Sequence, residues 1–300
     1  MEQPRSTTFI ESNDIKANFN RYLAWWILFI SIGYQYKLIF CGGLGLGLGQ
    51  KWICYTMIHG ITSNHWFEHL VYVPLMWVAL HQVNQAVFGP GENEIISKKL
   101  RRRKWIGAFL AAIYIYGHGM HIMNTVEMWS RQNHGITTGP VYEQIWWIDE
   151  QLSHLVQFVA FFLLMAWFIA QDRLDRTHSK NIAIISGVLH GIDRGVGVVE
   201  GDSSSLGFFL MGTIMLACAY RWYRHDKNFW RSWQDFFFRH SFIFCITMAL
   251  LLGFYSFFFG LDVQPSEMGN AAVQVAILGI FMIVIEITLV VALDRLVQKK

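Results

Sequence analysis

The chain has 300 residues, of which 54% are hydrophobic and 15% are charged, and its net charge at pH 7 is +3. Soluble globular proteins carry about 25% charged residues, so this composition excludes a surface that faces mainly water, and it excludes intrinsic disorder as well. The small net charge, with basic residues placed beside apolar segments, argues against a nucleic-acid-binding protein. These properties predict an all-α, polytopic integral membrane protein with a helical bundle fold.

Long apolar segments follow a polar N-terminal tail over residues 1–21. About 20 apolar residues cross the hydrocarbon core as a helix, and eight segments approach that length. The count is seven if the first segment does not span, and the fifth segment scores poorly by hydropathy because it contains charged residues. Together they predict one transmembrane domain over residues 1–300, with helices near 22–40, 65–88, 105–129, 145–170, 181–199, 206–220, 242–260 and 271–293.

The distribution of Lys and Arg predicts the orientation of these helices. With the N-terminus inside, 20 of the 24 Lys and Arg residues fall on the inner side, as positively charged loops of membrane proteins do. The C-terminus is then also inside. The outer connector between the first two helices carries Cys41 and Cys54, which form a disulfide only in an oxidising compartment. Cys218 and Cys245 fall within predicted helices and are expected to be buried.

Ionisable and polar residues recur in four consecutive predicted helices. Residues three or four positions apart share one face of a helix, so each group can converge on one point. The groups are His65 and His69 in the second helix, His118 and His121 in the third, Asp149, Glu150 and His154 in the fourth, and His190, Asp193 and Arg194 in the fifth. Because ionisable groups inside a membrane are costly, each group is a candidate functional site.

The predicted topology places all four groups in one layer, between the middle of the membrane and its outer surface. At a rise of 1.5 Å per residue, His118 and His121 lie roughly 21 and 25 Å beyond Lys104, and His190 lies roughly 15 Å beyond Lys180. The fourth helix returns from the outside, so its polar residues fall in its first turns. Since the topology was derived without reference to histidine, this agreement indicates a single site.

Such a layer predicts a metal centre, because imidazole is the commonest protein ligand of transition metals and carboxylates complete their coordination. Zinc or iron is favoured, with copper or haem as alternatives. The predicted metal ligands are His65, His69, His118, His121, His154, His190 and Asp193, with His65 and His69 forming a candidate second metal position. Glu150 and Asp149 are the candidate catalytic bases. Arg194 is a candidate to bind a substrate phosphate or carboxylate, or to form an ion pair with Asp193 or Glu200.

The predicted function is that of a metal-dependent enzyme acting on a membrane lipid or another apolar substrate. Hydrolysis is preferred over oxygenation, because a carboxylate and a metal-bound water suffice without an electron donor. One alternative is a haem- or copper-binding redox protein. Another is a proton- or ion-coupled transporter, whose polar groups should extend to both faces, whereas the inner half carries few besides His81 and Glu286. A hydrogen-bonded polar seam without metal is the third alternative.

Two partial resemblances to known families involve these same residues. His121 followed by Asp149 and Glu150 on the next helix resembles the seven-helix hydrolases that include alkaline ceramidases and progestin/adiponectin-type receptors. His65-x-x-x-His69 and His118-x-x-His121 resemble parts of the histidine boxes of membrane fatty-acid hydroxylases and desaturases. The late H-x-x-x-H of the first family and the H-x-x-H-H box of the second are absent, so the resemblances assign no residue a role.

Overall fold

The computed structural model describes residues 57–58, 61–88, 98–171, 180–201, 203–225 and 227–260. The predicted helices near 22–40 and 271–293, and the connector that holds Cys41 and Cys54, lie outside these residues. The prediction of a disulfide in that connector is therefore untested, as are the total of eight helices and the orientation of the C-terminus.

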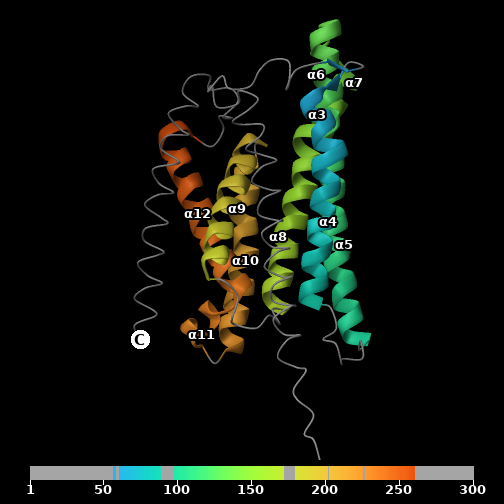
Figure 1. Cartoon of the computed structure of the whole chain (residues 1–300). Coiled ribbons are helices and arrows are strands. Elements are labelled where there is room, and N and C mark those ends of the chain that lie inside the picture. Colours follow the sequence, from blue (N-terminus) through green and yellow to red (C-terminus); the bar gives the residue numbers. More distant parts are fainter. Residues whose placement is uncertain are drawn as a thin grey trace, which may run out of the picture.

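Helices stand side by side in an elongated bundle, with α6 and α7 at its upper end and α11 at its lower end (Figure 1). Short strands β1 and β2 pair antiparallel before the first described helix. In chain order the elements are β1 (Met57–Ile58), β2 (Ile61–Thr62), α3 (Ser63–Phe67), η2 (Glu68–Tyr72), α4 (Val73–Phe88), α5 (Lys98–Met120), α6 (Met123–His134), α7 (Pro140–Trp146), η3 (Trp147–Ser153), α8 (His154–Gln171), α9 (Lys180–Glu200), α10 (Ser204–Arg224), α11 (Phe229–Trp233) and α12 (Phe236–Phe259).

The predicted helical bundle is confirmed in its coarse form. Four helical segments in the described part are long and apolar enough to cross a membrane: Lys98–Arg131, Pro140–Gln171, Ser204–Arg224 and Phe236–Phe259. The polar α9 is not among them, in keeping with its poor predicted hydropathy. Large apolar side chains such as Phe209, Leu216 and Phe257 are exposed on the outside of the bundle, where a bilayer would cover them.

Small residues allow α9 and α12 to pack closely, and this pair makes the most extensive contact among the described helices. A Cβ on Gly187 would lie 2.6 Å from the carbonyl oxygen of His240, and one on Gly191 would lie 2.6 Å from the Cβ of Thr247. Glycines four residues apart form a stripe on one helix face, the pattern by which membrane helices bring their backbones together. The stripe therefore determines which side chains of the two helices meet.

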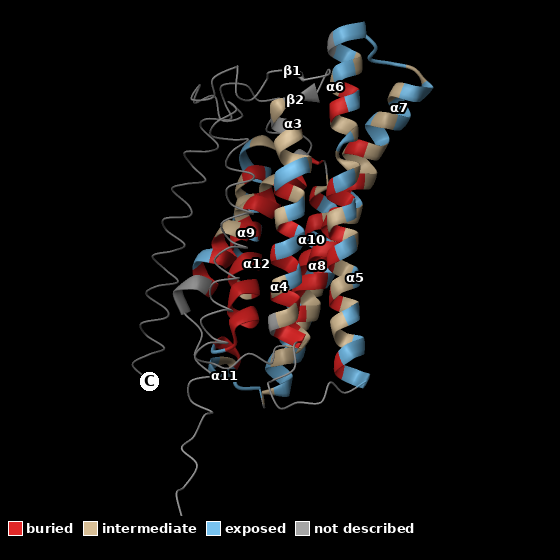
Figure 2. Ribbon diagram, turned by 45° about the vertical axis from the view of Figure 1, so that its right-hand side comes forward, coloured by how far each residue is buried: buried red, intermediate tan, exposed pale blue. Residues whose placement is uncertain are grey.

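A second close approach joins α5 to α8 in the interior of the bundle, where buried residues concentrate (Figure 2). A Cβ on Gly117 would lie 2.7 Å from Cγ of Gln157, so only glycine permits this spacing. The side-chain amide of Gln157 donates a hydrogen bond of 3.3 Å to the carbonyl oxygen of Gly117. This contact holds the upper part of α5 against the beginning of α8.

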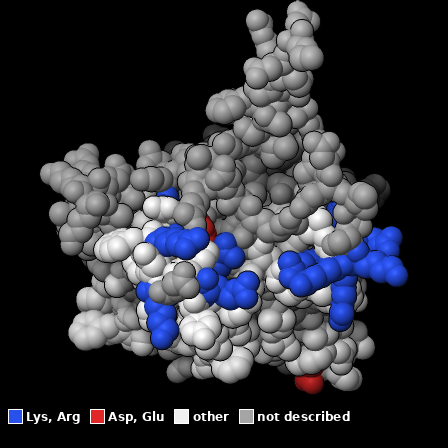
Figure 3. Space-filling view, turned by 90° about the horizontal axis from the view of Figure 1, so that it is seen from below, with Lys and Arg blue, Asp and Glu red and all other residues white. Residues whose placement is uncertain are grey.

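Basic side chains gather on the lower end of the bundle (Figure 3). Exposed members come from the start of α5 and from the stretch that runs from the end of α10 into α11, namely Lys98, Lys99, Arg101, Arg102, Arg224, Lys227 and Arg231. Both regions belong to segments that the Lys and Arg distribution predicts to lie inside. The structure thus groups these segments at one end, and the sidedness of that end stays a prediction.

Candidate functional site

Two π-helical segments, η2 and η3, occur in the upper part of the bundle. Short π-helical turns within α-helices are rare and are found frequently at functional sites, because the wider turn redirects side chains. Segment η3 carries Asp149, Glu150 and Ser153, and η2 carries Glu68 and His69. The sequence indicated these residues by their polarity but gave no sign of the altered helical geometry.

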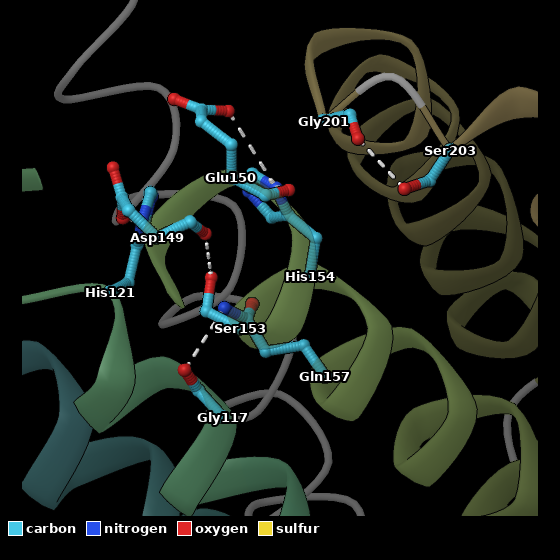
Figure 4. Close-up of polar contacts among 9 residues, drawn as sticks. All are labelled: Gly117, His121, Asp149, Glu150, Ser153, His154, Gln157, Gly201 and Ser203. Atoms are coloured by element: carbon cyan, nitrogen blue, oxygen red, sulfur yellow. Dashed lines mark hydrogen bonds and ion pairs between the residues drawn. The ribbon is translucent and has the colours of Figure 1, made fainter. Parts of the chain in front are cut away.

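A hydrogen bond joins His121, just after α5, to Asp149 of η3 (Figure 4). It runs from Nδ1 of the imidazole to Oδ1 of the carboxylate, which is fully buried. Ser153 donates a hydrogen bond to the backbone oxygen of Asp149, which fixes the π-helical turn that presents this carboxylate. The polar groups predicted on the third and fourth helices therefore meet in a direct contact between the side chains of His121 and Asp149.

His154 lies beside this pair, with its ring centroid 5.1 Å from that of His121. Its Nδ1 is 2.7 Å from the carbonyl oxygen of Glu150 and 3.9 Å from a carboxylate oxygen of the same residue. Gly201, at the end of α9, covers the ring from the other side: a Cβ there would lie 2.5 Å from Nδ1 of His154 (Figure 4). Sequence reasoning missed this glycine, since only the folded chain brings it to His154.

His118 is the third histidine of the group, one turn before His121 on α5. It is 3% exposed, and among the described residues neither of its ring nitrogens has a hydrogen-bond partner. The ring contacts Tyr114 edge-on at 5.0 Å between centroids, and it interacts electrostatically with His121 and His154. A buried polar atom without a partner costs about 1–3 kcal/mol, so the two ring nitrogens of His118 are unfavourable as they stand.

The hydrogen bonds determine which nitrogen of each ring carries a lone pair. A carbonyl oxygen and an ionised carboxylate can only accept, so Nδ1 donates in both His121 and His154. In a neutral ring bonded in this way, Nε2 carries the lone pair. Histidines that bind metals have this arrangement, with one nitrogen anchored on a carboxylate or carbonyl and the other facing the ion.

Arg194 and Asp193 form a buried ion pair in α9, with Nε and Oδ2 2.8 Å apart. The guanidinium also lies over the rings of Tyr114 and Phe161, at 5.7 and 5.2 Å from their centroids. The structure thus shows the ion-pair alternative that the sequence left open for Arg194. The ring of Tyr114, which contacts both this guanidinium and His118, places the ion pair near the histidine group.

Of the other predicted ligands, His190 has a different histidine as its neighbour, whereas His69 belongs to η2, whose Tyr72 contacts the ring of His118 edge-on at 6.3 Å between centroids. His190 is fully buried and contacts His240 of α12. His65 is buried in α3, His69 is half-buried in η2, and both have interactions there. The structure therefore brings together His118, His121, His154, Asp149 and Glu150, while it gives His190 another histidine as its neighbour.

No set of three or more His, Cys, Asp or Glu side chains within the described ranges is already arranged as a metal-binding group. A further polar contact, from the Tyr142 hydroxyl of α7 to the Glu127 carboxylate of α6, joins the two helices above the site. Sequence analysis did not single out this pair.

Comparison with protein-family models, curated proteins and solved structures found no match for this chain.

Proposed function

We propose that this protein is a multi-pass membrane enzyme that uses one transition metal ion, held by His118, His121 and His154. Zinc or iron is the favoured metal, the substrate is a membrane lipid or another apolar molecule, and hydrolysis is preferred over oxygenation. The same proposal includes eight transmembrane helices. It places the C-terminus inside and this site toward the outer leaflet. His65, His69, His190 and Asp193 are left out of the ligand set.

One observation carries the proposal: the anchored Nδ1 atoms of His121 and His154, with lone pairs on both Nε2 atoms beside an unpartnered His118. A polar seam without a ligand would be expected to satisfy the ring of His118 as well, because unsatisfied buried groups are destabilising. Metal binding would require the three nitrogens to approach one another. Rotation of His118 toward the other two rings would break no hydrogen bond present in the described residues.

The two carboxylates take different roles under this proposal. Asp149 is fully buried and bonded to His121, so it orients a ligand. Glu150 is 22% exposed at its side chain and is therefore the better candidate for the general base. A metal ion with three protein ligands keeps an open position, and it lowers the pKa of a bound water to about 7. Glu150 would accept the proton as this water attacks an ester or amide carbonyl.

Lipid turnover tests the enzymatic part of the proposal. The purified protein would be incubated with liposomes containing phospholipids, ceramides and acylglycerols, and the products would be identified by mass spectrometry. Cleaved products are expected for hydrolysis, whereas an added oxygen atom would indicate oxygenation. Glu150→Gln should lower the rate by about 10²- to 10⁴-fold, the usual contribution of a general base.

Glu143→Gln is the matched control for that assay, because Glu143 is exposed on the neighbouring helix α7. It should retain the wild-type rate. Unchanged turnover after treatment with a strong chelator would contradict the metal-dependent mechanism, and no turnover of any of these lipids would contradict the proposed substrate class.

Gly201→Ala is expected to weaken metal binding, because the added Cβ would displace the His154 ring and its hydrogen bond to Glu150. The loss should be about 10- to 100-fold in affinity, as for other groups that orient metal ligands. Gly119→Ala is the control: Gly119 adjoins His118, but nothing lies within 4 Å of its added Cβ. Metal titration of both variants checks this prediction, and equal affinities would refute the role of Gly201.

A further inference from the structure

A face of exposed side chains runs along α5 and changes character at the lower end of the bundle. Trp105 is 70% exposed, and Phe109 and Tyr116 are exposed on the same helix face, four and eleven residues further along. Arg101 and Arg102 continue this face, because they precede Trp105 by four and three residues. Side chains that face lipid therefore give way to positively charged ones within one helical turn.

The same change occurs on α10, which ends at the lower end of the bundle, where α5 begins (Figure 1). Leu216, Tyr220 and Tyr223 are exposed along one face of this helix, and Arg224 follows them. Nζ of Lys227 lies 6.0 Å from the centre of the Tyr223 ring. Aromatic side chains beside basic ones are typical of the interface between the hydrocarbon core and the lipid headgroups. Two helices far apart in the sequence therefore place this interface at the same end of the bundle.

Positive charge at this end exceeds negative charge. No ion pair within the described residues joins the exposed cations at the start of α5 to a carboxylate. The carboxylate of Asp235, just before α12, is buried and already pairs with Arg221. Across residues 89–104, 171–180 and 221–239, which the predicted topology assigns to this side, the sequence has 14 Lys and Arg against six Asp and Glu. This excess of charge attracts an external anion.

Two hydrogen bonds hold the basic turn of α5 in place. The indole Nε1 of Trp167 on α8 donates to the carbonyl oxygen of Arg103 at 3.2 Å, and the side-chain amide of Asn84 on α4 donates to that of Lys104 at 3.1 Å. Leu100, between the exposed basic residues, is buried. The turn is therefore fixed against two neighbouring helices while its charged side chains are exposed. A binding surface that is ordered in advance loses less conformational freedom when it binds a ligand.

We propose that the basic surface at the lower end binds the headgroup phosphate of an anionic phospholipid in the adjoining leaflet. This surface consists of the exposed Lys and Arg residues at the start of α5 and from the end of α10 into α11 (Figure 3). The planar guanidinium of arginine binds phosphate through two parallel hydrogen bonds, and clusters of about four to eight basic residues beside a membrane helix attract anionic lipids. A lipid rather than a soluble anion is the occupant, because both groups of basic residues continue helix faces that acyl chains cover. The inference is independent of the proposed metal centre, which lies in the upper part of the bundle.

Lipid retention by the purified full-length protein tests this proposal. Native mass spectrometry of the protein in detergent would compare phosphatidylglycerol with phosphatidylcholine that carries the same acyl chains, and the wild type should bind phosphatidylglycerol more tightly. One basic residue near a membrane surface contributes about fivefold in affinity for anionic lipid. Arg101→Gln combined with Arg102→Gln should therefore weaken phosphatidylglycerol binding by about 25-fold, while the rest of the turn keeps its positive charges.

Arg131→Gln is the control variant, because Arg131 is exposed on α6 at the upper end of the bundle. It should retain the wild-type affinity, whereas the single variant Arg102→Gln, which loses the same charge, should bind phosphatidylglycerol about fivefold more weakly. Equal binding of both lipids by the wild type, undiminished phosphatidylglycerol binding in the double variant, or an equal loss in Arg131→Gln would overturn the proposal. Soluble glycerol phosphate that binds as tightly as the lipid would assign the surface to a soluble anion and would overturn it as well.

Discussion

Asp149→Asn is expected to lower the affinity of the protein for its metal ion by about 10- to 100-fold. The carboxylate of Asp149 holds Nδ1 of His121 and so directs Nε2 toward the proposed ion. An amide at this position keeps the shape but loses the charge that strengthens the bond and sets the tautomer of the ring. Titration with zinc or iron under anaerobic conditions, followed by bound-metal analysis, measures the change.

Asp235→Asn provides the control for the loss of a buried carboxylate. Asp235 lies at the beginning of α12, away from His118, His121 and His154. It is 3% exposed and pairs with Arg221 at 2.8 Å. Its replacement should leave metal affinity unchanged even where it lowers thermal stability. If both variants lose metal equally, the effect of Asp149 is one of folding and the proposed orienting role is wrong.

Gly191→Ala is expected to destabilise the fold by about 1–3 kcal/mol, which is the usual cost of inserting a methyl group into a packed interior. The added Cβ would meet the Cβ of Thr247 at 2.6 Å and the carbonyl oxygen of Phe244 at 2.9 Å. These are atoms close to the backbone of α12, so they cannot move aside as the end of a flexible side chain could. Thermal unfolding in detergent should show a lower midpoint.

Gly212→Ala gives the matched comparison on α10, where nothing lies within 4 Å of the added Cβ. Since alanine favours helix by up to about 1 kcal/mol over glycine, this variant should be as stable as the wild type or more stable. Equal destabilisation of the two variants, or none at Gly191, would contradict the close packing of α9 on α12.

The class of fold and part of the site could be predicted from the sequence, because both follow from local patterns. Apolar length predicts membrane helices, and the three- or four-residue spacing of polar side chains identified His118, His121 and His154. The direct contact of His121 with Asp149 follows from the arrangement of neighbouring helices. Hydropathy could also anticipate that α9 would be too polar to be recognised as a spanning helix.

Other features depend on the folded chain. The predicted helix near 242–260 leaves out His240, whereas α12 begins at Phe236 and buries this histidine. The run of aromatic residues at 236–238, directly before His240, is the signal that would extend the predicted helix. Gly201 carried no signal, since its role comes only from its distance to His154. The ring tautomers required hydrogen-bond partners that sequence spacing does not reveal.

Bound metal in the purified full-length protein tests the central claim most directly. Mass spectrometric analysis of protein prepared in detergent would compare the wild type with His118→Ala and with the exposed-site control His81→Ala. We predict about one zinc or iron ion per chain in the wild type and the control, and a clear loss in His118→Ala. No metal in the wild type, even after reconstitution with zinc, iron and copper, would contradict a metal centre at these histidines.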